Sequence, residues 1–190
     1  MKISRVYLLS LIVSLLSFTA KAQQQKIVEV CYNPNLVKDT SKKSIKSMAY
    51  SVVDGDSIKI AYHSPGVRKR IIWGGLVPYN EVWVTGAHDA TTVEFQSDVS
   101  IEGKKIPAGK YAFFTIPGKK EWIVIINKQW EQHLATEYEE KDDLVRIKVK
   151  PKKNAHTERL QYFINSQKDD KGTISVAWEK LMIAIDFKRQ

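Results

Sequence analysis

The chain is divided by turn residues into short runs rich in β-branched and aromatic side chains. Glycine- and proline-containing turns stand at Asp54-Gly55, Glu102-Gly103, Pro107-Ala108-Gly109, Pro117-Gly118 and Lys171-Gly172. The runs lie at 49–53, 56–62, 91–95, 110–116, 121–127, 144–150, 160–165, 173–178 and 181–187. The intervals between them are too short for crossover helices, which a parallel sheet would need. We therefore expect an all-β, mainly antiparallel domain, either a β-sandwich or a Greek-key barrel.

Two local patterns add detail to this fold. Asp54-Gly55 separates two strand-like runs, which is typical of a two-residue hairpin turn whose positions need positive φ. After Asn127, a possible N-cap, apolar Trp130, Leu134 and Tyr138 recur every four residues. That spacing predicts one short helix near residues 128–139.

Composition favours one ordinary globular domain. The 190 residues carry 30 Lys and Arg against 21 Asp and Glu, and 43% of them are hydrophobic. The single cysteine, Cys31, excludes a disulfide framework within the chain, and no Cys–His spacing is that of a zinc finger. Cys31 could be buried in a strand, exposed as a free thiol or paired between chains. The sequence indicates no cofactor.

The N-terminus has the pattern of a secretory signal peptide. Lys2 and Arg5 precede an apolar run over 6–20, and Ala20-Lys21-Ala22 is a small-x-small cleavage site. The run has about 15 residues, whereas a spanning helix needs roughly 20. We predict cleavage after Ala22, no later membrane span, and a periplasmic or secreted protein. The expected organisation is a signal peptide over 1–22, a short strand and polar linker over 23–48, and a sandwich domain over 49–188.

The segment 64–92, SPGVRKRIIWGGLVPYNEVWVTGAHDATT, is too long and too rich in glycine to be one strand. Its motifs SPGVRKR, IWGGLVPY and EVWVTGAHDATT, followed by IEGKKIPAGKYAFFTIPG at 101–118, resemble the secreted bacterial family called domain of unknown function 2911. The resemblance covers roughly 50–187 and implies no activity, because the family has no established biochemistry. Val84 and His88 stand where the family pattern has Arg and Asn.

The same segment holds the candidate ligand-binding residues. Aromatic side chains close to arginines could stack a sugar ring or hold an anionic group. The candidates are Arg68, Arg70, Tyr79, Trp83, Thr85, His88 and Asp89. Trp83 could equally be a core residue. The preferred hypothesis is a non-catalytic binding module for a glycan, a peptide or another envelope component.

A metal-assisted enzyme is the alternative. His88 and Asp89 are adjacent and His63 is near in sequence, and imidazole with carboxylate suits zinc or a similar ion. The spacing is not diagnostic, because a loop whose Asp and His bond to nearby backbone has the same sequence. No nucleophile motif accompanies it, so whether the chain is an enzyme stays open, with a binding module preferred.

Three basic patches, Lys42-Lys43, Arg68-Lys69-Arg70 and the lysines of 148–153, bear on possible partners. An exported protein rarely meets nucleic acid, so we expect no nucleic-acid partner. An electrostatic partner would be an anionic glycan, a lipid headgroup or an acidic protein. Solvated lysines that protect exposed strand edges also explain the patches, and this is the preferred interpretation. The oligomeric state is not predicted.

Overall fold

A computed structural model describes residues 41–190. The predicted signal peptide, its cleavage site, the short strand near 26–32 and Cys31 lie outside the described residues. No helix within 41–190 is long and apolar enough to cross a membrane.

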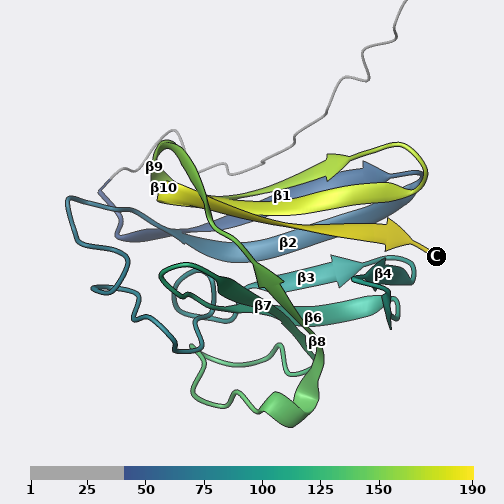
Figure 1. The fold of residues 1–190 in the computed structure, drawn as a ribbon, viewed down its shortest axis with the longest axis horizontal. Helices are drawn as coiled ribbons and strands as arrows, with labels where there is room; N and C mark the ends of the chain where they lie inside the picture. The colour runs from purple at the N-terminus through teal and green to yellow at the C-terminus, as the bar shows by residue number, and fades with distance from the viewer. Residues whose placement is uncertain (1–40) are drawn as a thin grey trace, which may run out of the picture.

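The described chain forms two antiparallel sheets (Figure 1). The six-stranded sheet has the order β1-β2-β3-β6-β7-β8, and the four-stranded sheet has the order β5-β4-β10-β9. The strands are β1 Ser44–Val53, β2 Asp56–Pro65, β3 Thr92–Phe95, β4 Val99–Ile101, β5 Lys104–Ile106, β6 Gly109–Ile116, β7 Trp122–Asn127, β8 Asp143–Val149, β9 Lys152–Ser166 and β10 Lys171–Arg189. The predicted all-β fold is confirmed, and two open sheets make it a sandwich rather than a closed barrel.

The hairpin predicted at Asp54-Gly55 joins β1 to β2. Asp54 has φ 49° and Gly55 has φ 90°, as the two-residue turn requires. The strand pairing begins at Val53 and Asp56 and runs to Ser44 and Pro65. β1 therefore starts at Ser44, and residues 44–48, which we expected in the linker, belong to the sandwich.

The long β9–β10 hairpin covers the inner face of the six-stranded sheet. Figure 1 shows it lying across β1 and β2, which β9 contacts. Alternate residues of the strands point into the space between the sheets, where they form one large apolar core that includes Ile60, Val93, Phe113, Tyr162 and Trp178. β10 spans the two predicted runs 173–178 and 181–187. Irregularities in its pairing with β9 between Ala177 and Leu181 separate the two runs.

The helix predicted near 128–139 is wrong. Residues 128–139 form an irregular loop, and the helix present is a single 3-10 turn at Glu140–Asp142. Leu134 has φ 56°, which no α-helix accommodates, and its side chain is 45% exposed. Asn127 accepts a hydrogen bond from the Gln129 amide through its side chain and so closes a local turn.

The four-residue apolar spacing has another origin. Trp130 and Tyr138 pack on the outer face of the six-stranded sheet against a small second cluster that includes Phe114 and Ile125. The loop 128–142, which lies below β8 in Figure 1, thus covers β6 and β7 without forming an α-helix. Tertiary packing overrides the local helical periodicity here.

Candidate functional site

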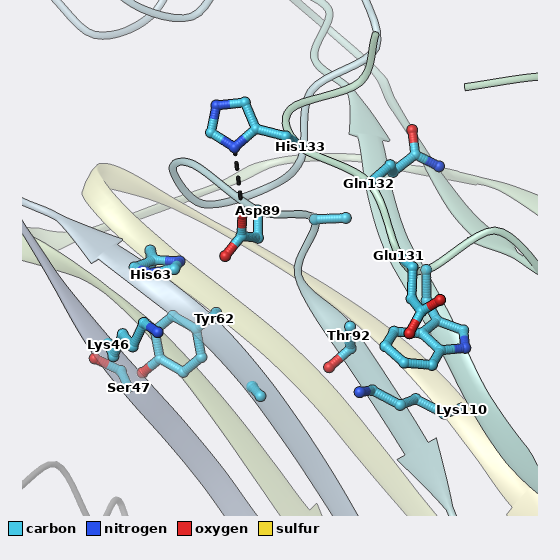
Figure 2. Close-up of a pocket in the computed structure, with 13 residues that line it drawn as sticks. Lys46, Ser47, Tyr62, His63, Asp89, Thr92, Lys110, Glu131, Gln132 and His133 are labelled. Carbon is cyan, nitrogen blue, oxygen red and sulfur yellow. Dashed lines mark hydrogen bonds and ion pairs between the residues drawn. The ribbon is translucent and has the colours of Figure 1, made fainter. Parts of the chain in front are cut away.

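A groove of about 510 Å³ opens on the outer face of the six-stranded sheet. It lies where the cover provided by the loop 128–142 ends and the outer face of β1, β2 and β3 is bare. Figure 2 shows Lys46 and His63 on the β1–β2 side, Thr92 and Lys110 on the β3–β6 side, and Asp89 with His133 above them. The lining residues are Lys46, Ser47, Ala61, Tyr62, His63, Asp89, Ala90, Thr92, Lys110, Trp130, Glu131, Gln132 and His133.

Small side chains make the floor of the groove. Ala61 of β2 pairs with Thr92 of β3, and Thr92 pairs with Ala112 of β6. These three residues share the outer face of adjacent strands, because directly paired residues point to the same side of a sheet. Ala61 and Thr92 line the groove and leave room that larger side chains would fill, whereas Ala112 is fully buried beside them.

Two loops join to make the upper wall. The Ala90 amide donates to the Gln132 carbonyl at 2.9 Å, and the Leu134 amide donates to the His88 carbonyl at 2.7 Å. Between these bonds, His133 Nδ1 lies 3.2 Å from Asp89 Oδ1, an ion pair when the imidazole is protonated. Residues 132–134 of the loop thus use two backbone hydrogen bonds to pair with residues 88–90, bonds that an α-helix would have needed within the loop.

A buried polar network holds the 85–91 segment in place. Thr85 is fully buried with φ 52°, a conformation rarely adopted by a β-branched residue. Its hydroxyl bonds to Thr115 Oγ1 at 2.9 Å, and its carbonyl accepts from Thr91 Oγ1 and Tyr162 Oη. Burial raises the pKa of Tyr162, so its hydroxyl remains a protonated donor. These buried hydrogen bonds thus hold the turn that carries His88 and Asp89 in one conformation.

The groove brings together charges of both signs. Lys46 and Lys110 face Asp89 and Glu131, and Lys110 Nζ lies 3.5 Å from the centre of the Trp130 ring. The hydrogen bond from His133 is the main influence that lowers the pKa of Asp89. Partial burial is the main influence that lowers the pKa of His63, and it outweighs the opposite effect of the Asp89 carboxylate. At neutral pH the groove therefore offers the ionised carboxylate of Asp89 and the neutral imidazole of His63.

Three imidazole rings approach one another at the rim. The ring centres of His63 and His88 are 5.1 Å apart, and those of His88 and His133 are 6.5 Å apart. Asp89 lies among them through its contact with His133. Within residues 41–190, no three His, Cys, Asp or Glu side chains are arranged to hold a metal ion together.

The structure separates most of the candidate residues that sequence indicated. Arg68 and Arg70 are exposed at the start of the 66–80 segment, where their guanidinium groups donate to the Ser41 and Gly66 carbonyls. Tyr79 lies beside Lys119, 5.9 Å from its ring centre to Nζ. Thr85 is buried behind the groove. Asp89 is the one candidate ligand-binding residue that lines the groove, and His63 of the metal alternative lines it too.

Trp83 belongs to a cluster of four tryptophans. Its ring stacks on Trp178 at 5.8 Å and meets Trp73 edge-on at 5.9 Å, and Trp122 completes the group. Its Nε1 donates to the Gly86 carbonyl at 3.1 Å. The contacts of Trp83 are those of a residue packed against the main core.

Sequence reasoning missed Lys46, Lys110, Trp130 and His133. Lys46 and Lys110 occupy polar positions in strands whose residues alternate between apolar and polar. This pattern does not indicate which lysines come close together across a sheet. Trp130 and His133 lie in the segment assigned to a helix, which gave no sign that Trp130 meets Lys110 or that His133 meets Asp89. The pairing of 88–90 with 132–134 brings them together, and no local pattern encodes it.

These features define an all-β sandwich domain with an open, polar groove on one sheet. The family model described as "Protein of unknown function (DUF2911)" matches residues 44–187, and the chain belongs to this family. The matched range begins at the first residue of β1 and ends within β10. No curated protein matches the chain, and no solved structure matches it either.

Proposed function

We propose that the domain is an exported binding module whose groove takes a small, hydroxyl-rich ligand such as one or two units of a glycan. The groove carries the proposal, since its volume of about 510 Å³ is that of a small-molecule site and it combines an aromatic side chain with a few polar groups.

The balance of charge favours a saccharide over a simple anion. Lys46 and Lys110 can donate hydrogen bonds, while the Asp89 and Glu131 carboxylates can accept them. Two cations and two carboxylates leave little net charge for an anion to neutralise. A sugar both donates and accepts through its hydroxyl groups, which suits a groove that holds donors and acceptors together.

A variant that fills the groove tests this proposal. Ala61→Leu adds bulk to the floor without removing a polar group, and Ser100→Leu places a leucine at a partly exposed position of β4 in the other sheet. Both are screened on an array of bacterial envelope and plant saccharides, with calorimetry on any saccharide that binds. We expect wild-type affinity in the micromolar to millimolar range, a loss of about tenfold or more in Ala61→Leu, and no change in Ser100→Leu. Equal binding by Ala61→Leu, or no saccharide bound by the folded protein, contradicts the proposal.

Export is tested separately. In a bacterial host the chain should appear outside the cytoplasm with Gln23 at its N-terminus, because cleavage is expected after Ala22. Mass spectrometry of the fractionated protein measures both. An intact Met1 in the cytoplasmic fraction would refute export.

A metal-assisted enzyme centred on His88 and Asp89 is the second candidate, and the approach of the His63, His88 and His133 rings favours it. The side chains of His133 and Asp89 are well exposed, so rotation could turn them toward a shared ion. Titration with Zn²⁺, Co²⁺ or Ni²⁺ should then give one equivalent bound, lost in His88→Ala. A protein that binds no ion under these conditions would exclude this second candidate.

A further inference from the structure

Two aliphatic side chains stand out in solvent at one end of the sandwich. Ile71 is 79% exposed and Leu76 is 46% exposed, and both belong to the segment 66–80 that connects β2 toward β3. Exposed apolar residues are common singly, but two in one short loop beside a basic cluster are a feature of interaction surfaces.

The loop holds these side chains outward. Ile72 and Val77, their neighbours in sequence, are each 2% exposed and anchor the segment in the main core. The Leu76 amide donates to the Ile71 carbonyl at 3.0 Å, and the Val77 amide donates to the Ile72 carbonyl at 2.9 Å. Gly75 permits the tight turn, because a Cβ there would lie 2.5 Å from the Ile71 oxygen. Ile71 cannot turn inward without displacing Ile72.

Cations surround the same end. The start of the described chain lies against the 66–70 turn and β9, since the Gly66 amide donates to the Lys43 carbonyl and Arg159 donates to the Lys42 carbonyl. Glu158 is the acidic residue among them, and its carboxylate accepts from the Arg68 amide. The cations gathered there are Lys42, Lys43, Arg68, Lys69, Arg70 and Arg159.

We propose that this basic end, with Ile71 and Leu76 at its tip, docks onto the surface of an anionic lipid bilayer. The cations attract acidic headgroups, and the two aliphatic side chains reach the boundary between headgroups and acyl chains. A soluble anion would account for the cations but not for the aliphatic pair. Two exposed aliphatic residues are also few for the apolar centre of a stable protein interface. The attachment is weak, reversible and sensitive to salt.

Vesicle co-sedimentation of the exported chain tests the proposal. Phosphatidylcholine vesicles are compared with vesicles that contain about 30% phosphatidylglycerol, and we expect at least about fivefold stronger partitioning to the anionic ones, lost on addition of about 0.5 M salt. Equal partitioning to both vesicle types overturns the proposal.

Matched variants locate the contact. Ile71→Gln with Leu76→Gln should lower partitioning by about fivefold or more, whereas Val52→Gln, which replaces a 49% exposed valine on β1, should leave it unchanged. Lys69→Glu should lower it by a similar factor, and Lys150→Glu should not. All four variants change only exposed side chains, and an unchanged melting temperature confirms folding. Wild-type partitioning by the Ile71/Leu76 double variant contradicts the proposal.

Two further results separate this surface from its alternatives. Ala61→Leu should bind vesicles normally, since docking does not depend on the groove. A second result to look for is that millimolar glycerol phosphate competes with vesicle binding while the Ile71/Leu76 double variant binds vesicles like the wild type. That pair of results would show that the site recognises the phosphate group alone, and it would overturn the proposed bilayer contact. Docking to an acidic protein in place of vesicles would also overturn it.

Discussion

The two faces of the six-stranded sheet are built from the same strands but are covered in different ways. On β6, Phe113 points inward into the large core beneath β9 and β10, while its neighbour Phe114 points outward into the small cluster beneath the loop 128–142. The inner face is covered by the long β9–β10 hairpin together with the irregular segment 66–84, whose Ile72 and Val77 join the large core. The outer face is covered over β6 and β7 only, and the groove opens at the edge of that cover.

This difference separates the large apolar core, which stabilises the fold, from the groove, which is the proposed binding site. The inner core requires close packing of large apolar side chains, which leaves little freedom for polar groups. The outer face needs only enough cover to bury Phe114 and Ile125, so the loop that covers it can end in polar side chains at the groove. The following changes should therefore act differently on the two faces.

The largest expected effect is on the inner face. Trp178 is 2% exposed and contacts Trp73 and Trp83, so Trp178→Ala should lower the free energy of unfolding by about 3–5 kcal/mol. Half-buried Trp130, on the outer face, is the matched control, and its change to Ala should cost about 1–2 kcal/mol. Thermal and denaturant unfolding measure both. Equal losses of unfolding free energy in the two variants would show that both faces of the sheet contribute equally to stability, contrary to this expectation.

The second effect concerns the attachment of the outer cover. The Asp143 carboxylate accepts hydrogen bonds from Asn127, Tyr138 and Arg146 at 2.7–2.8 Å, and its side chain is 5% exposed. Burial and the bond to Asp143 raise the pKa of Tyr138, so its hydroxyl stays a donor. Asp143→Ala leaves three donors without their acceptor and should cost about 2–3 kcal/mol.

Hydrogen exchange locates this loss. Amides in the loop 128–142 should exchange faster in Asp143→Ala, while those of β10 in the inner core should change less. In Asp143→Asn, which keeps the shape of the side chain, the exchange rates should lie between those of Asp143→Ala and those of the wild type. Uniform acceleration over both regions would mean that the outer cover and the inner core unfold together.

The smallest effect is the pH dependence at the groove. Partial burial lowers the pKa of His63 from its ordinary value of 6.5, so the unfolded chain takes up a proton more readily than the folded chain. His63 therefore favours the folded state above pH 6.5, and this contribution is lost as the pH falls through and below that value. The loss should be less than about 1 kcal/mol, because the side chain is partly solvated.

The change His63→Asn isolates this contribution. Stability curves between neutral pH and pH 5 should be flatter for His63→Asn than for the wild type. His156→Asn, the same change at an exposed position of β9, serves as the substitution control, and the test is whether His63→Asn differs from it. Identical slopes in His63→Asn and the wild type would contradict the assignment.

Most strands were predictable from the sequence because their signals are local. Asp54-Gly55 marked its hairpin, and the runs at 110–116 and 121–127 differ from β6 and β7 by one residue at a single end. The short strands β4 and β5, on either side of the Glu102-Gly103 turn, were too brief to be recognised as runs. The helix failed because Trp130 and Tyr138 repeat with a helical spacing while packing against a sheet.

The site was much less predictable. Asp89 and His63 were named for their chemistry, and both line the groove. Trp83 was named for its position opposite Val82 and Val84, but its ring meets three other tryptophans from distant parts of the chain. The contacts of His133 with Asp89 and of Lys110 with Trp130 join residues that no motif connects.

By itself, the sequence determined the strand content, the antiparallel arrangement and the family, because each rests on residues that are neighbours along the chain. The tertiary structure decided where the outer face is covered and where it is bare, and so where the groove lies. That outcome depends on the pairing of 88–90 with 132–134 and on strand register across β1, β2, β3 and β6, which are contacts between distant segments.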